Sequence, residues 1–122
     1  MKDTDWTSAT VDALVTAYAQ AAAEQGHYSE AGDHKRANRR TATIAAIYRE
    51  LRGRSDDAKE ALRPLLYDAN EHVRLWAAAH ALDFSPSDGE PVLSELTNLR
   101  GLAGLNAKMT LREWRQGTLR FR

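Results

Sequence analysis

The chain has 122 residues, the length of one domain that can bury a core without disulfide support. It contains no cysteine, which excludes disulfides and thiolate metal sites, and its formal net charge is zero, so no global attraction to nucleic acid or anionic membranes is expected. No apolar run approaches the roughly 20 residues that span a bilayer, and the N-terminal stretch lacks the apolar segment of a secretory signal. We therefore expect a cytoplasmic protein with a single domain over residues 1–122.

Helical periodicity runs through the whole chain, and no alternating run of β-branched residues predicts a strand. The pair Gly32-Asp33 is typical of a helix end followed by the N-cap of the next helix, and Ser55 before two acidic residues predicts another N-cap. Pro64 predicts a kink inside the third helix. The expected helices cover about residues 11–31, 34–52, 56–67, 70–82, 89–99 and 105–116.

The last helix and the chain ends carry several large apolar residues. The expected core residues of the last helix are Leu105, Met109, Leu111 and Trp114. Beyond Gly117 we expect a frayed terminus. Three aromatic residues near the ends either close the helical stack within one chain or form a homodimer patch, so that both a monomer and a homodimer are possible: Trp6, Trp114 and Phe121.

Residues 58–82 carry the most specific pattern. The stretch "LRPLLYDANEHVRLWAAAHAL" resembles a HEAT repeat at Leu65, Leu66, Asp68, Val73, Arg74, Ala77, Ala78 and Leu82. The chain as a whole also resembles a family of small bacterial proteins of uncharacterised function, through "HKRANRR", "IYREL", "VRLWAAAHAL" and "MTLREWRQG". The resemblance implies an all-α fold, an α-α superhelix of about three HEAT-like antiparallel hairpins with about six helices, and it supplies no established activity.

The side chains of the second helix of this repeat could either pack against neighbouring helices or bind a ligand. Small residues at Ala77, Ala78 and Ala81 would let neighbouring helices approach closely. We expect the turn carboxylate of Asp68 to accept hydrogen bonds from the start of the fourth helix or from an arginine. Arg74 would then be the partner of that carboxylate, and the alternative is a ligand-binding arginine. Trp76 is expected to pack against a neighbouring hairpin. His80 is expected to be a hydrogen-bonded, partly buried imidazole, although it could line a groove.

Charge is distributed in alternating blocks. Counting Lys and Arg against Asp and Glu, the net charge is −5 over residues 1–33, +6 over 34–54, −5 over 55–100 and +4 over 101–122. The densest basic block holds Lys35, Arg36, Arg39 and Arg40. Their like-charge pairs at four-residue spacing repel one another, so we expect carboxylates of this chain, an acidic protein partner or nucleic acid to offset the repulsion.

No pattern predicts a catalytic, cofactor-binding or metal site. His72 and His80 lie two helical turns apart, and His27 and His34 lie on either side of a predicted helix end, so neither pair could hold a metal alone. No serine occupies a nucleophile elbow, and no glycine-rich phosphate loop is present. We therefore expect no enzymatic activity.

Two functions remain. The favoured one is an adaptor that binds another protein, such as an enzyme or toxin that it inhibits, through the groove formed by the even-numbered helices, using Arg74, Trp76 and His80. The alternative is a nucleic-acid-binding helical-repeat protein that uses residues 35–40 and the basic segment 112–122.

Overall fold

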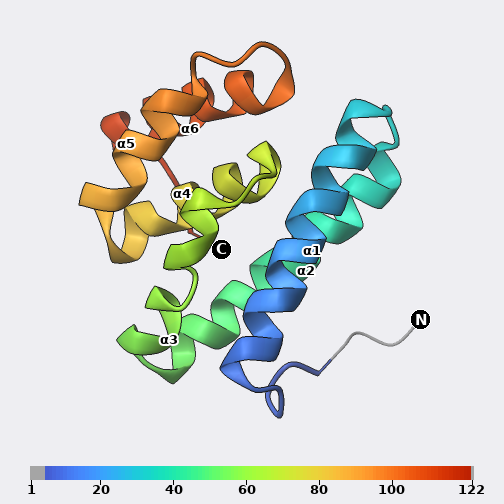
Figure 1. The fold of residues 1–122 in the computed structure, drawn as a ribbon, viewed down its shortest axis with the longest axis vertical. Coiled ribbons are helices and arrows are strands. Elements are labelled where there is room, and N and C mark those ends of the chain that lie inside the picture. The colour runs from blue at the N-terminus through green and yellow to red at the C-terminus, as the bar shows by residue number, and fades with distance from the viewer. Residues whose placement is uncertain (1–4, 122) are drawn as a thin grey trace.

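The computed structural model describes residues 5–121, which form six α-helices and one 3₁₀ helix and contain no strand (Figure 1). The predicted all-helical class is therefore confirmed. The elements are α1 (Val11–Glu30), α2 (His34–Arg54), α3 (Asp56–Glu60), η1 (Arg63–Tyr67), α4 (Glu71–Phe84), α5 (Pro86–Leu96) and α6 (Leu102–Gln116).

Short polar side chains begin several of these helices. The Oδ1 atom of Asp33 accepts from the backbone N–H of Arg36 at 3.1 Å, and the hydroxyl of Ser55 accepts from the N–H of Ala58 at 3.1 Å. Gly32 precedes Asp33 with φ +77°, a conformation that L side chains rarely adopt. These caps confirm the predicted boundaries, because each satisfies an N–H group that has no partner within its helix.

The third predicted helix is broken rather than kinked. Helix α3 ends at Glu60, and the chain continues as the 3₁₀ helix η1, with Pro64 in its first turn. Inside one continuous α-helix, Pro64 would leave the carbonyl of Glu60 without its donor, and the proline ring would clash with that carbonyl. In the first turn of a helix the backbone N–H groups have no intrahelical acceptor, so the missing N–H of Pro64 costs no hydrogen bond there. The chain therefore ends α3 and begins a new helix at this point.

The C-terminal helices also differ from the prediction. Helix α5 begins and ends three residues earlier than expected, and α6 begins at Leu102. Leu105 and Met109 were expected in the core, but their exposed fractions are 52% and 47%. The buried face of α6 is instead made by small residues and one leucine, Ala103, Gly104, Ala107 and Leu111.

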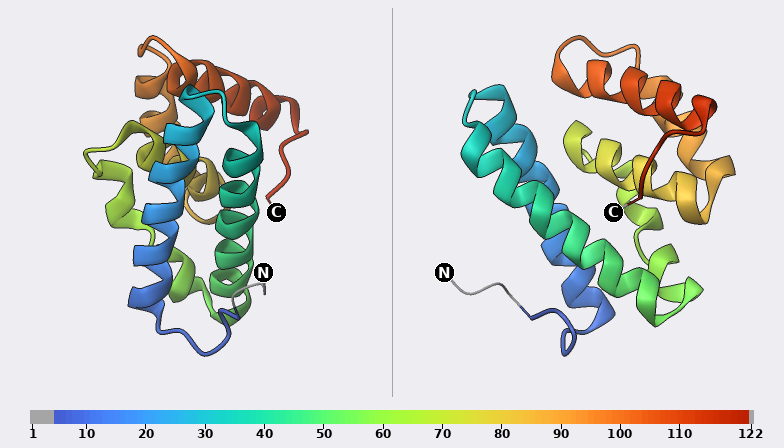
Figure 2. Two further views of the ribbon diagram at one scale, coloured as in Figure 1. Left: turned by 90° about the vertical axis from the view of Figure 1, so that its right-hand side faces the viewer. Right: turned by 180° about the vertical axis from the view of Figure 1, so that it is seen from behind.

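The segment after Gly117, expected to be frayed, returns to the body of the molecule. Leu119 and Phe121 pack against the core, and the carbonyl of Phe121 accepts from Nη1 of Arg52 at 3.1 Å. Figure 2 shows this segment running from the end of α6 back toward α2. Trp6 and Trp114 also pack against the core, which supports the expectation that the terminal aromatic residues close the stack within one chain.

Helix α4 lies at the centre of the molecule. The long antiparallel pair α1/α2 packs on one side of it, while α5 and α6 lie on the other (Figures 1 and 2). Ala77, Ala78 and Ala81 are fully buried, and a Cβ at Gly89 of α5 would come within 2.7 Å of the carbonyl oxygen of Ala78. The predicted close approach through small residues is therefore confirmed. None of the helices described here has the length and apolar character needed to cross a membrane.

Candidate functional site

Helix α4 carries the three residues predicted to bind a protein, but they do not share one surface. Arg74 lines a hollow between α4 and α5, and Trp76 lines a second hollow on the side of α2 and α6. His80 has an exposed fraction of 6% and lies in the core. The predicted single groove is therefore divided into two surfaces, with His80 behind them.

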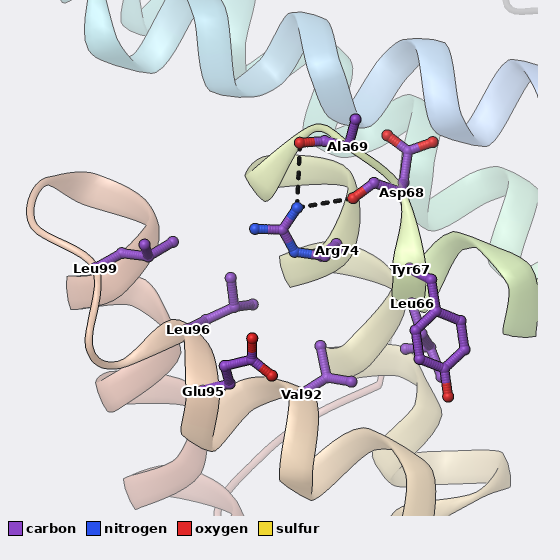
Figure 3. Close-up of a pocket in the computed structure, with 9 residues that line it drawn as sticks. All are labelled: Leu66, Tyr67, Asp68, Ala69, Arg74, Val92, Glu95, Leu96 and Leu99. Carbon is purple, nitrogen blue, oxygen red and sulfur yellow. Dashed lines mark hydrogen bonds between the residues drawn. The ribbon is translucent and has the colours of Figure 1, made fainter.

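The larger hollow, here named the α4–α5 groove, has a volume of about 400 Å³ (Figure 3). The end of η1 and the turn that follows it form one wall, and α5 forms the other. Its lining residues are Leu66, Tyr67, Asp68, Ala69, Arg74, Val92, Glu95, Leu96 and Leu99.

Arg74 is held in this groove by the backbone of the turn. Its Nη1 donates to the carbonyl oxygens of Asp68 at 2.7 Å and Ala69 at 3.1 Å. The predicted pairing of Arg74 with the carboxylate of Asp68 is wrong. That carboxylate accepts from the backbone N–H of Asn70, the N-cap of α4, at 2.9 Å, which is the other role expected for Asp68. Within residues 5–121, Arg74 makes no ion pair, and the unbonded side of its guanidinium faces the space beside Leu96 and Leu99 (Figure 3).

Apolar side chains surround this guanidinium. Tyr67 has an exposed fraction of 75%, and Leu99 at the end of the groove has one of 36%. Val92 and Leu96 form the apolar part of the α5 wall, with the carboxylate of Glu95 beside them (Figure 3). The groove thus combines one fixed cation and the carboxylates of Asp68 and Glu95 with exposed aromatic and aliphatic surface.

The second hollow, here named the α2–α4–α6 hollow, has a volume of about 280 Å³. Trp76 lies in it, and its Nε1 donates to Oε1 of Gln25 in α1 at 3.3 Å. Met109 is the exposed apolar residue of the α6 wall. The other lining residues are Thr41, Leu75, Ala79, Asn106, Thr110 and Glu113. The contact with α1 agrees with the expected packing of Trp76 against a neighbouring hairpin.

His80 belongs to a buried polar network. Its Nδ1 lies 2.6 Å from the hydroxyl of Tyr18, and its ring stacks on that of Tyr48 with centroids 3.9 Å apart. The hydroxyl of Tyr48 donates to Oδ2 of Asp83 at 2.5 Å. The structure therefore confirms a hydrogen-bonded imidazole, and the ring is more deeply buried than the sequence suggested.

Burial sets the protonation state of this network. Loss of hydration lowers the pKa of His80 to about 3, while Asp83 raises it and Arg52 lowers it by smaller amounts. Burial also raises the pKa values of the Tyr18 and Tyr48 hydroxyls. All three rings are neutral near pH 7, so the network joins α1, α2 and α4 without a buried imidazolium.

The basic block of α2 is partly neutralised by this chain. Arg40 pairs with Glu24 at 2.7 Å and Arg36 pairs with Asp33 at 3.5 Å. Both guanidiniums also lie over the ring of Tyr28, 5.4 and 5.7 Å from its centroid. Intramolecular pairing is thus confirmed for two of the four cations. Lys35 and Arg39 are exposed and make no ion pair with any residue in the range 5–121.

A cluster of possible metal ligands was missed by the sequence analysis. His72, at the start of α4, lies with its Nε2 3.1 Å from Oε1 of Glu30 and 3.9 Å from Oε1 of Glu71. One ligand atom from each of the three residues lies within 4.8 Å of the others. Glu30 is separated from His72 by 42 positions, so no local spacing motif could reveal the cluster.

Comparison with known proteins gives a family without an assigned activity. The crystal structure of the protein RPA1889 from Rhodopseudomonas palustris CGA009 is similar, with a TM-score of 0.89 and 27% sequence identity over 98% of this chain and 100% of that chain. No curated protein matches the sequence. Residues 12–114 match the family described as "Domain of unknown function (DUF2019)". The chain therefore belongs to the DUF2019 family.

Proposed function

We propose that the protein is a non-catalytic interaction module, built from HEAT-like hairpins, that binds a segment of another protein in the α4–α5 groove. The proposal rests on the contacts and surroundings of the Arg74 guanidinium. Two backbone carbonyls fix its guanidinium, no carboxylate among residues 5–121 lies within ion-pair distance of it, and exposed Tyr67 and Leu99 line the same groove.

The chemistry of the groove suits an acidic residue between apolar neighbours. A guanidinium presents a planar set of donors that matches a carboxylate, and fixing it in advance reduces the entropy lost on binding. Arginine and tyrosine are also the residue types that most often dominate interface energetics. We therefore propose that a partner carboxylate binds the free side of Arg74 while apolar side chains contact Tyr67 and the α5 wall.

Nucleic acid is the less favoured ligand. Arg36 and Arg40 already pair with carboxylates of this chain, which leaves Lys35 and Arg39 as the free cations of the block. Phosphate binding depends on many cations along one continuous face, and the affinity then falls steeply with salt. Among residues 5–121, two unpaired cations in this block are too few for that mode, and in the second basic segment Arg115 pairs with Glu90.

The experiment combines capture of the partner with matched surface variants. Tagged protein is incubated with its native lysate at moderate salt, with and without nuclease, and bound proteins are identified by mass spectrometry. A single stoichiometric partner that survives nuclease is then tested by titration against Tyr67→Ser, Arg74→Gln and Met109→Ser. Tyr67 and Met109 are both exposed, so we expect neither replacement to disturb the fold. The two residues lie in different hollows, so Met109→Ser is the matched control for Tyr67→Ser.

We expect Tyr67→Ser and Arg74→Gln each to weaken binding by about tenfold or more, and Met109→Ser to leave it unchanged. The reverse pattern would place the partner in the α2–α4–α6 hollow and contradict the proposed site. Capture that disappears with nuclease would instead support the nucleic-acid alternative and direct mutagenesis to Lys35 and Arg39.

A further inference from the structure

We infer that Glu30, Glu71 and His72 bind a divalent transition-metal ion of the zinc type. The three residues come from two elements that are distant in sequence, the last turn of α1 and the first turn of α4. Their ligand atoms lie within 4.8 Å of one another at the junction of these helices. This site is separate from the α4–α5 groove and does not depend on the function proposed for that groove.

The separations between ligand atoms fit a tetrahedral ion. Bonds of 2.0–2.2 Å to nitrogen and oxygen place the ligands of tetrahedral zinc about 3.3–3.6 Å apart. The Nε2 atom of His72 lies 3.1 Å from the Glu30 carboxylate and 3.9 Å from the Glu71 carboxylate, values that bracket this spacing. All three ligand atoms lie within 4.8 Å of one another, so rotamer changes of the two partly exposed glutamates can bring their carboxylates to this spacing around an ion.

The histidine is fixed in place before any ion binds. Its side chain is only 7% exposed, and the ring lies directly against the backbone of α1 at Gly26. A Cβ at position 26 would lie 2.1 Å from Cγ of His72, so the ring occupies space that only glycine leaves open. A ligand held in one orientation loses little entropy on coordination, which favours a site with few protein ligands.

The ligand types select the class of ion. One imidazole nitrogen with two carboxylates suits zinc and similar transition metals, whereas calcium and magnesium prefer sites made of oxygen atoms. The side chains of Glu30 and Glu71 are 52% and 37% exposed, so water can complete the coordination. The two carboxylates would neutralise the charge of the ion, which would link the end of α1 to the start of α4.

A zinc titration with matched variants tests the inference. The protein is treated with EDTA, dialysed, and titrated with ZnCl₂ in a calorimeter, while histidine side-chain nitrogens are followed by ¹H–¹⁵N NMR. Glu30→Gln and Glu71→Gln remove one ligand charge each at exposed positions, so the fold is retained. His27→Ala is the control, because His27 is exposed on α1 three residues from Glu30 and could bind zinc adventitiously with it.

We expect one equivalent of zinc to bind and to shift the ring nitrogens of His72 but not those of His27, His34 or His80. Each glutamine variant should weaken binding by about tenfold or more, and His27→Ala should leave it unchanged. The inference is overturned if zinc does not bind the wild-type protein, if both glutamine variants bind it equally well, or if binding requires His27. The His72–Glu30 contact would then be a hydrogen bond between helices and nothing more.

Discussion

His72 and His80 lie eight residues apart on α4, and each has an exposed fraction of 6%. Their surroundings differ almost completely. His80 is enclosed by the rings of Tyr18 and Tyr48, whereas His72 lies beside Gly26 with its Nε2 directed toward two carboxylates. One end of α4 therefore presents imidazole as a packing group, and the other presents it as a ligand.

The comparison shows that burial alone does not assign a role to a histidine. At His80 the contacting groups are the neutral rings of Tyr18 and Tyr48, and loss of hydration outweighs the smaller, mutually opposed effects of Asp83 and Arg52 and lowers the pKa to about 3. At His72 the neighbours are two carboxylates that are partly open to solvent, so a metal ion can be accommodated there. The two sites should respond very differently to mutation, acid and metal.

The largest expected effect is the loss of the His80 ring. His80→Ala removes the stack on Tyr48 and leaves the buried hydroxyl of Tyr18 without its partner, so we expect the free energy of unfolding to fall by about 3 kcal/mol or more. His72→Ala removes a buried ring packed against Gly26 and one hydrogen bond to the exposed carboxylate of Glu30, and we expect a smaller loss of about 1–2 kcal/mol. Urea denaturation followed by circular dichroism measures both. Equal losses would show that the two histidines contribute equally to stability and would contradict the contrast drawn between them.

Acid should destabilise the protein through His80. In the unfolded chain this histidine takes up a proton below pH 6.5, whereas in the folded protein it does so only near pH 3. Stability is therefore unaffected above pH 6.5 and falls by roughly 1 kcal/mol for each pH unit below it, until the folded pKa is reached.

The control for this pH dependence is His80→Phe, which retains a ring against Tyr48 but cannot bind a proton. Urea titrations of both proteins between pH 7 and pH 4 give two slopes of unfolding free energy against pH. Carboxylates contribute to both slopes, so their difference isolates His80. If the two slopes are the same, His80 takes up its proton over the same pH range in the folded and unfolded protein, and the lowered pKa assigned to it is wrong.

Features that depend on neighbours along the chain were predicted correctly from the sequence. The caps at Asp33 and Ser55 and the small-residue face of α4 involve residues within one or two turns, and the structure confirms them. The break at Pro64 was misjudged because a proline admits either a kink or a new helix start, and tertiary packing decides between them.

Features that depend on which face a helix buries were harder to predict. Leu105 and Met109 suggested a core face for α6 because of their size, but α6 lies close to its neighbours through Ala103 and Ala107, and the larger residues point outward. The cluster at His72 was missed for a related reason. Its partners on α1 are brought to it only by the packing of α1 on α4, which no local motif encodes.

The expected effect with the least intuitive sign is at Gly26. Replacing a helical glycine with alanine ordinarily stabilises a protein by up to about 1 kcal/mol. Gly53 of α2 has no atom within 4 Å of an added Cβ, so Gly53→Ala should follow this rule. At Gly26 the added methyl group would overlap the ring of His72, so Gly26→Ala should instead destabilise the protein by about 1–2 kcal/mol.

The pair of alanine variants also separates packing from ligation. Displacing the His72 ring should weaken zinc binding as well as stability in Gly26→Ala, while Gly53→Ala should leave the zinc affinity unchanged. Thermal unfolding with and without ZnCl₂ measures both quantities in one experiment, because an ion that binds only the folded state raises the melting temperature. A stabilised Gly26→Ala protein would show that the ring moves aside freely, and the contrast between a fixed His72 and an enclosed His80 would then rest on His80 alone.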